Sequence, residues 1–198
     1  MPRDTKRGFT LIELLTVMAI IGVFVAVATP SWMSLRRRAA VRSAATEIRT
    51  IFHLVRSRAI ARGANSGVKF TQLPGGEWQF AVYDDGDGDG VRNDDIRNGV
   101  DRVAQPSRYL NQQPQLASIA LPASSIVDPD GTRIASGASA VQFNRSTICS
   151  FTPMGQATPG TIYLTDSAGE VYAVRVYGAS AKLRLLRYIA ATTKWEAR

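Results

Sequence analysis

A short acidic stretch of this 198-residue sequence carries a metal-binding pattern. Asp85, Asp87 and Asp89 alternate along the chain, and Gly90 follows them directly. In a calcium loop, oxygen ligands stand at positions 1, 3 and 5, a glycine at position 6 makes the sharp turn, and a backbone carbonyl at position 7 is the next ligand. The sequence therefore predicts a calcium site with six candidate ligands: Asp85, Asp87, Asp89, Val91, Asn93 and Asp95.

The match to a calcium loop is partial. Position 12, which supplies a bidentate carboxylate in such loops, is Ile96, and Asp95 stands one residue early. Asp101 is another possible donor. The alternative interpretation is a solvated turn that extends a hairpin, although mutual repulsion among so many carboxylates favours a bound cation.

Other chemistry finds little support in the sequence. No paired catalytic carboxylates, Ser/His/Asp set, metal-binding histidines or phosphate loop can be identified, so we do not expect an enzyme. His53 is the single histidine and is expected to be structural. Cys149 is the single cysteine, which excludes an internal disulfide and favours a small buried core residue.

Glu13 stands near the start of an apolar stretch over residues 8–32. The 22 residues between Glu13 and Arg36 carry no charge. A helix needs about 20 apolar residues to cross a bilayer, whereas the apolar core of a secretory signal has about 7–15. The stretch therefore predicts a membrane anchor. A carboxylate at the edge of such a segment is costly and requires a partner.

The seven residues from Arg7 to Glu13, followed by the apolar run, resemble the processing and methylation motif of type IV prepilins and type II secretion pseudopilins. This resemblance implies that a prepilin peptidase cuts after Gly8 on the cytoplasmic face and that Phe9 is then N-methylated. It also implies that Glu13 meets the N-terminal amine of a neighbouring subunit during assembly, where the two charges neutralise one another. The alternative is an ordinary membrane anchor that contains a glutamate.

The resemblance predicts three segments. Residues 1–8 are the leader, residues 9–35 are the transmembrane half of an N-terminal helix, and residues 36–198 are a periplasmic domain that includes an amphipathic helix half over 36–62.

The net charge of +8 falls to +6 without the leader. A basic chain suits anionic partners such as nucleic acid or lipid headgroups, although a solvated surface explains the charge equally.

The periodicity predicts an α+β fold in which one long N-terminal helix packs on antiparallel sheet. Apolar residues recur at three- and four-residue spacing through 37–62, and residues 63–67 contain the expected helix breakers. From residue 68 the period changes to two, which predicts strands over 68–70, 78–83, 140–143, 147–151, 161–164, 171–177 and 182–188. Residues 97–137 are predicted to form an elaborated loop with one or two short strands.

Residues 151–155, 160–164 and 172–176 resemble the GspH/FimT class of minor pseudopilins and pilins. The resemblance implies a protein of the bacterial inner membrane that builds or primes the periplasmic pseudopilus of a type II secretion system together with other pseudopilins. The alternative is a FimT-like minor pilin that binds DNA for uptake in natural transformation.

FimT-like minor pilins that bind DNA carry a Gly-Arg-x-Arg signature. Here the matching positions are Ala181, Lys182 and Arg184, so the tight turn and one arginine fork are expected to be lost. The basic residues that could contact phosphates are Arg175, Lys182, Arg184 and Arg187. Alternating basic residues on a strand are also typical of a solvent-exposed face.

Overall fold

The computed structural model describes residues 9–110, 116–122, 126–134, 137–166 and 168–198, without the side chains of residues 27–31. The chain divides into two compact units, Met1–Arg36 and Arg37–Arg198. One helix, α1 (Leu11–Arg62), runs from the first unit into the second. The predicted leader, including Gly8, lies outside the described residues.

In the first unit, α1 presents an apolar surface. Every large apolar side chain from Leu11 to Val25 is at least half exposed in the isolated chain. Within the part of the chain that is described, no helix contains a stretch long and apolar enough to cross a membrane.

In the second unit, α1 is amphipathic as predicted. The seven residues of the apolar stripe are at most 3% exposed: Val41, Ala44, Ile48, Ile51, Phe52, Val55 and Ala59. The helix ends at Arg62, where Gly63 takes the left-handed conformation (φ 65°) that terminates a helix without a Cβ penalty.

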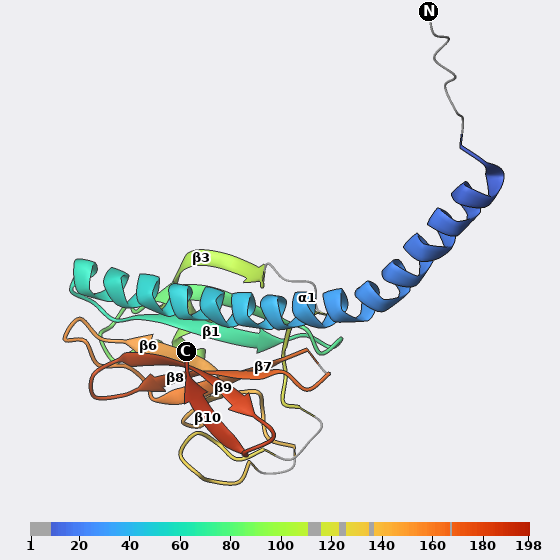
Figure 1. Ribbon diagram of the computed structural model, residues 1–198. Helices are drawn as coiled ribbons and strands as arrows, with labels where there is room; N and C mark the ends of the chain where they lie inside the picture. The colour runs from blue at the N-terminus through green and yellow to red at the C-terminus, as the bar shows by residue number, and fades with distance from the viewer. Residues whose placement is uncertain (1–8, 111–115, 123–125, 135–136, 167) are drawn as a thin grey trace, which may run out of the picture. The chain divides into compact units, whose positions relative to one another are not determined.

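Two antiparallel sheets form the rest of this unit (Figure 1). One sheet has the order β3-β2-β1-β6, with strands β1 (Ser66–Gln72), β2 (Trp78–Asp84), β3 (Arg102–Tyr109) and β6 (Ile148–Phe151). The other has the order β10-β9-β8-β7-β4, and β5 also pairs with β7. Its strands are β4 (Ser118–Ile119), β5 (Val141–Phe143), β7 (Gly160–Thr165), β8 (Val171–Tyr177), β9 (Lys182–Ile189) and β10 (Lys194–Ala197).

Phe52 joins the helix to both sheets. Its ring lies 6.1 Å from that of Phe70 on β1, 5.9 Å from Phe143 on β5 and 5.9 Å from Phe151 on β6, measured between centroids. A second, smaller cluster covers the other face of the second sheet and includes Tyr163 and Leu186. The predicted α+β fold, with a long N-terminal helix and antiparallel sheets, is therefore confirmed.

The described part of region 97–137 contains two strands, in agreement with the one or two that the sequence predicted, but the first of them is longer than expected. The structure has a short helix, α2 (Asn93–Asn98), and the eight-residue strand β3 before the brief β4. Strand β3 is an edge strand with mostly exposed side chains and Pro106 in its middle. An edge strand need not alternate in polarity and can accommodate proline, which is why its sequence shows no strand signal.

Candidate functional site

The N-terminal motif contains a helix cap. The backbone N–H and the hydroxyl of Thr10 both donate to Oε2 of Glu13 at 2.8 Å, and the N–H of Glu13 donates to the Thr10 hydroxyl at 3.3 Å. This is a reciprocal capping box at the start of α1. The Thr-x-x-Glu spacing signals it in the sequence, and our sequence analysis missed it. Phe9 precedes the cap and is 89% exposed.

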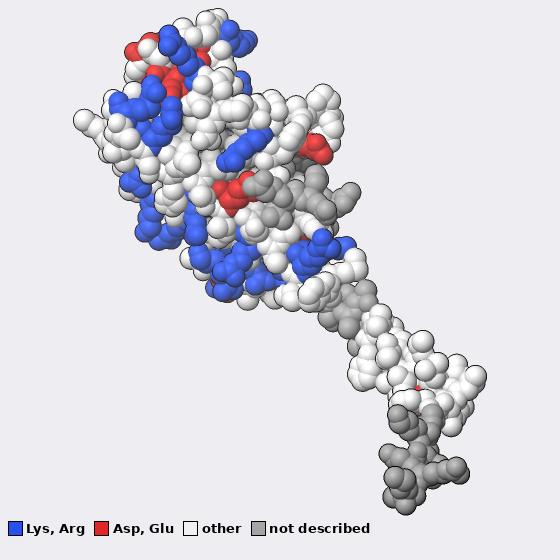
Figure 2. Space-filling view, turned by 90° about the horizontal axis from the view of Figure 1, so that it is seen from above, with Lys and Arg blue, Asp and Glu red and all other residues white. Residues whose placement is uncertain are grey.

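Charge is distributed unevenly along the molecule (Figure 2). The first part of α1 carries almost no charged atoms in this view, whereas Lys and Arg side chains gather over the domain. The part of α1 that belongs to the domain carries arginines, among them the exposed Arg42 and the half-buried Arg49. The apolar and the basic surfaces are thus separate, and each suits a different kind of neighbour.

The acidic loop is organised around Asp85. Oδ1 accepts the backbone N–H groups of Asp87 (3.0 Å) and Gly88 (2.8 Å), and Oδ2 accepts that of Gly90 (2.8 Å). The side-chain amide of Asn65 also donates to Oδ2 at 2.6 Å. Burial raises the pKa of Asp85, but these hydrogen bonds lower it to about 2.

The predicted calcium ligands partly converge. Carboxylate oxygens of Asp85, Asp87 and Asp89 lie within 4.8 Å of one another. Desolvation and the charges of Asp87 and Asp101 raise the pKa of Asp95. Asn93 begins α2, and Val91 is buried. Carboxylate oxygens are ligands that suit calcium, and three carboxylates converge here.

Asp101, considered in the sequence as a possible calcium donor, binds the backbone of the loop. Its two oxygens accept the backbone N–H groups of Gly86 (3.2 Å) and Arg92 (2.9 Å). Asp101 is only 3% exposed, and its carboxylate therefore connects the two ends of the loop through hydrogen bonds. Because both contacts are to backbone amides, no side-chain pattern in the sequence indicates this role.

Asp84 fastens the loop and β2 to the end of α1. Arg58 donates Nε to Oδ1 (2.7 Å) and Nη2 to Oδ2 (2.6 Å), and Arg62 Nη1 lies 2.8 Å from Oδ2. Ser66 adds a hydroxyl hydrogen bond at 2.9 Å. Hydrogen bonding by Arg58 is the main reason that the pKa of Asp84 lies below its usual range.

Two of the four predicted DNA-binding residues are held in intramolecular ion pairs. Arg175 donates Nη1 to Asp128 (2.8 Å) and Nη2 to Asp130. Arg187 forms a bidentate pair with Glu170 at 3.1 and 2.8 Å, and Glu170 also binds Arg38 of α1 at 2.9 Å.

The four basic residues also lie on two faces of the sheet. Arg175 pairs with Arg184 in register, and Tyr177 pairs with Lys182, so these three basic residues share one face. Arg187 pairs with Tyr172, which packs in the core beneath α1, so Arg187 lies on the other face. The structure therefore does not bring Arg187 together with the others.

Lys182 and Arg184 are exposed and lie beside an aromatic ring. The Arg184 guanidinium carbon is 5.7 Å from the ring centroid of Tyr177, and that of Arg175 is 5.9 Å from it. No ion pair is formed by Lys182 or Arg184 with the described residues. Of the four predicted residues, these two are therefore the ones that are exposed and free of ion pairs within the described chain, and Tyr177 lies beside them.

Our expectation about the turn before Lys182 is wrong. Ala181 has φ 44°, the left-handed conformation that glycine adopts most readily. Ala181 is also fully buried, and its carbonyl accepts a hydrogen bond from Arg56 Nη1 at 3.4 Å. The tight turn therefore survives the change of glycine to alanine, because core packing offsets the backbone strain.

Comparison with known proteins gives two family matches. The prokaryotic N-terminal methylation motif matches residues 3–29, and the family of the type II transport protein GspH matches residues 44–180. Two curated relatives, both called fimbrial protein, come from Neisseria meningitidis serogroup A and serogroup B. They are 31% and 30% identical over 115 residues, which cover 54% of this chain and 60% of each relative.

The chain thus spans less than two thirds of the length of these curated relatives. No solved structure matches it. The GspH match nevertheless extends over most of the chain and includes α1 from residue 44 and the strands up to β8. Together with the N-terminal motif and the pilin-like arrangement of helix and sheets, it shows that this chain belongs to the GspH family of type II transport proteins, with an N-terminal methylation motif.

Proposed function

We propose that this protein is a minor pseudopilin that builds or primes the periplasmic pseudopilus of a type II protein secretion system. The observation that carries the proposal is the presence on one chain of a methylation motif and a GspH domain. The motif match covers the start of α1, and the GspH match begins in the second half of the same helix and continues through the sheets. The role is structural, and no catalytic step is assigned to the chain.

The proposed maturation removes residues 1–8 by cleavage after Gly8 and methylates Phe9. Residues 9–35 are then held in the inner membrane as a single-pass anchor, with 36–198 in the periplasm. The exposed apolar side chains from Leu11 to Val25 support this division, because such a surface must be covered by lipid or by neighbouring helices. The partners are the prepilin peptidase, membrane lipid and the other pseudopilins of the filament.

Glu13 is suited to a contact between subunits. Both hydrogen bonds from Thr10 go to Oε2. Within the described chain no donor bonds to Oε1, which leaves that oxygen to accept the N-terminal ammonium of a neighbouring subunit. A carboxylate and an ammonium that are each costly in an apolar setting become less costly together.

Complementation of a deletion strain tests this role. The Glu13→Gln variant is expected to lose residues 1–8 normally, as measured by mass spectrometry, but to fail to join the filament and to support secretion. The Gly8→Val variant is expected to keep residues 1–8 and also to fail. Glu196→Gln, at an exposed position far along the chain, is the matched control and should secrete normally. Full secretion by a chain that retains residues 1–8 would refute the proposal.

DNA binding in natural transformation is the second candidate function. The exposure of Lys182 and Arg184 beside Tyr177 favours it, because basic groups next to an aromatic ring can contact phosphates and stack on bases. The test measures DNA affinity of the full chain across a salt series, with Lys182→Ala/Arg184→Ala as the variant and Arg97→Ala/Arg145→Ala as the control. Binding that weakens with salt and falls only in the first variant supports uptake, and equal binding by both variants contradicts it.

Calcium binding by the acidic loop stays a prediction. The convergence of Asp85, Asp87 and Asp89 supports it, and the absence of an acid at Ile96 weakens it. Calorimetric titration of the chelator-treated chain is the direct measurement. A Asp87→Asn/Asp89→Asn variant should lose the binding heat, whereas Asp94→Asn should retain it.

A further inference from the structure

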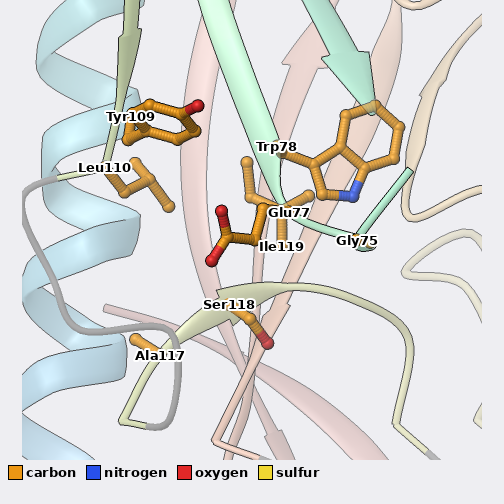
Figure 3. A pocket seen from close by; sticks show the side chains of 9 residues that line it. Gly75, Glu77, Trp78, Tyr109, Leu110, Ala117, Ser118 and Ile119 are labelled. Carbon is orange, nitrogen blue, oxygen red and sulfur yellow. The ribbon is translucent and has the colours of Figure 1, made fainter. Parts of the chain in front are cut away.

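A hollow of about 420 Å³ opens between the ends of the two sheets (Figure 3). One wall is the β1–β2 turn with Glu77 and Trp78, another is the end of β3 with Tyr109 and Leu110, and β4 supplies the rest with Ile119. The volume falls within the range of about 300–1,000 Å³ that is typical of ligand sites. The hollow shares no residue with the N-terminal motif, the acidic loop or the basic patch.

The walls of the hollow are fixed by the fold. The β1–β2 turn is closed by hydrogen bonds from the N–H of Leu73 to the carbonyl of Glu77 (2.8 Å) and from the N–H of Gly76 to the carbonyl of Leu73 (2.9 Å). The register places Tyr109 opposite Gln79, next to Trp78. Strand β4 belongs to the other sheet and is held by pairing with β7. The described walls of the hollow are therefore held in place by hydrogen bonds and strand pairing.

Glu77 is the charged group of the hollow. Figure 3 shows its carboxylate between Tyr109, Leu110 and Ser118. Nearly every other carboxylate in the described chain has a hydrogen-bond donor or a cation as partner, but none bonds to that of Glu77. Glu77 is exposed at the mouth of the hollow. Its carboxylate has no basic partner among the described residues, although the chain carries 24 Lys and Arg against 16 Asp and Glu.

We propose that this hollow receives a basic side chain, arginine or lysine, from an apolar segment of a partner protein. The aliphatic stem would pack on Trp78, Leu110 and Ile119, and the cationic head would pair with Glu77 beside the half-exposed ring of Tyr109. A cation is attracted both to a carboxylate and to the face of an aromatic ring, and both attractions strengthen when water is excluded. The negative charge of Glu77 thus favours a cationic side chain in the hollow. The apolar walls favour a partner segment in which the residues next to that side chain are apolar.

The test titrates a short peptide with one central arginine between leucines against the ¹⁵N-labelled full chain in zwitterionic detergent. A second peptide has lysine in place of arginine, and a third has citrulline, which keeps the shape of arginine without its charge. The readout is the indole N–H resonance of Trp78. The indole of Trp195, which donates to the carbonyl of Val127 at 2.7 Å on another part of the domain, is the internal control.

We expect saturable shifts of the Trp78 resonance with the arginine or lysine peptide, and binding about tenfold weaker with citrulline and with the Glu77→Gln variant. Glu196→Gln removes the same charge elsewhere and should leave the affinity unchanged. Equal binding of the citrulline peptide, or unchanged affinity in Glu77→Gln, would overturn the proposal, and so would a Trp78 resonance that does not shift with either cationic peptide. This test does not depend on secretion, so its outcome is independent of the proposed function.

Discussion

The Asp84→Asn substitution would test how the end of α1 is held to the sheet that carries the acidic loop. The change keeps the shape of the side chain but removes the charge that Arg58, Arg62 and Ser66 bind. Removing one partner of a buried ion pair costs about 3–5 kcal/mol. Arg58 and Arg62 are 34% and 45% exposed and can be solvated in the variant. We therefore expect a loss of about 2 kcal/mol at neutral pH, in line with hydrogen bonds to charged groups.

The pH dependence of the free energy of unfolding shows whether Asp84 acts through its charge or through the shape of its side chain. Because hydrogen bonding by Arg58 depresses the folded-state pKa of Asp84, its contribution is complete above the unfolded value of about 3.9 and is lost as pH falls through the folded value. Asp85 titrates in both the wild type and the Asp84→Asn variant, so its effect on stability cancels when their free energies of unfolding are subtracted. The two free energies of unfolding should therefore differ at pH 7 and 5 and converge in stronger acid.

Urea unfolding of the full chain in non-ionic detergent, followed by tryptophan fluorescence, measures these free energies. Asp94→Asn is the matched control, because the Asp94–Arg97 pair is about three-quarters exposed on both sides and should leave stability unchanged. A difference between wild type and Asp84→Asn that persists undiminished in acid would show that the amide disturbs packing, and would refute the electrostatic explanation.

Three further substitutions probe the loop, the core and the turn. Asp85→Asn should destabilise the metal-free chain more than Asp87→Asn in the same urea assay, because Asp85 accepts three loop amides and the Asn65 side chain, whereas Asp87 accepts one amide at 3.4 Å. Phe52→Ala should lower the free energy of unfolding by about 3–5 kcal/mol, because its ring contacts three other phenylalanine rings across both sheets. Ala181→Gly should change stability by less than about 1 kcal/mol, since relief of left-handed strain offsets the loss of a buried methyl group. Ala173→Gly, at an equally buried position in β8, loses a methyl group without such relief and should cost about 1.5 kcal/mol.

Features with a strong local period were predictable from the sequence. The stripe from Val41 to Ala59 on α1 has the 3.6-residue spacing of a buried helix face, and the predicted strands of the C-terminal half are all present. The sequence predicted one or two short strands within 97–137 but did not locate β3 or its eight-residue length, because an exposed edge strand is not required to alternate. Strand β10 was missed as well, and it is short with mostly exposed side chains.

The candidate sites were less predictable because they depend on contacts between distant residues. Asp128 and Arg175 are 47 residues apart, and their ion pair is set by the path of a loop across the sheet. A sequence can show that Arg175 and Arg187 are basic, but only strand register shows that they lie on opposite faces. The hollow beside Glu77 likewise needs β3 and β4 to be placed on either side of one turn.

The position of Ala181 shows how a motif can be misread when it is compared by residue identity. The sequence comparison treated the loss of glycine as the loss of a tight turn, because glycine is the residue that tolerates positive φ. The backbone at Ala181 still has φ 44°, and its buried methyl group packs in the main core. The conformation of the turn therefore places Lys182 and Arg184 at the exposed start of β9. Residues other than glycine can adopt this conformation when packing offsets the backbone strain. By this reasoning the turn keeps its geometry without the glycine, and the proposed binding of DNA rests on the charges that are unpaired among the described residues, those of Lys182 and Arg184.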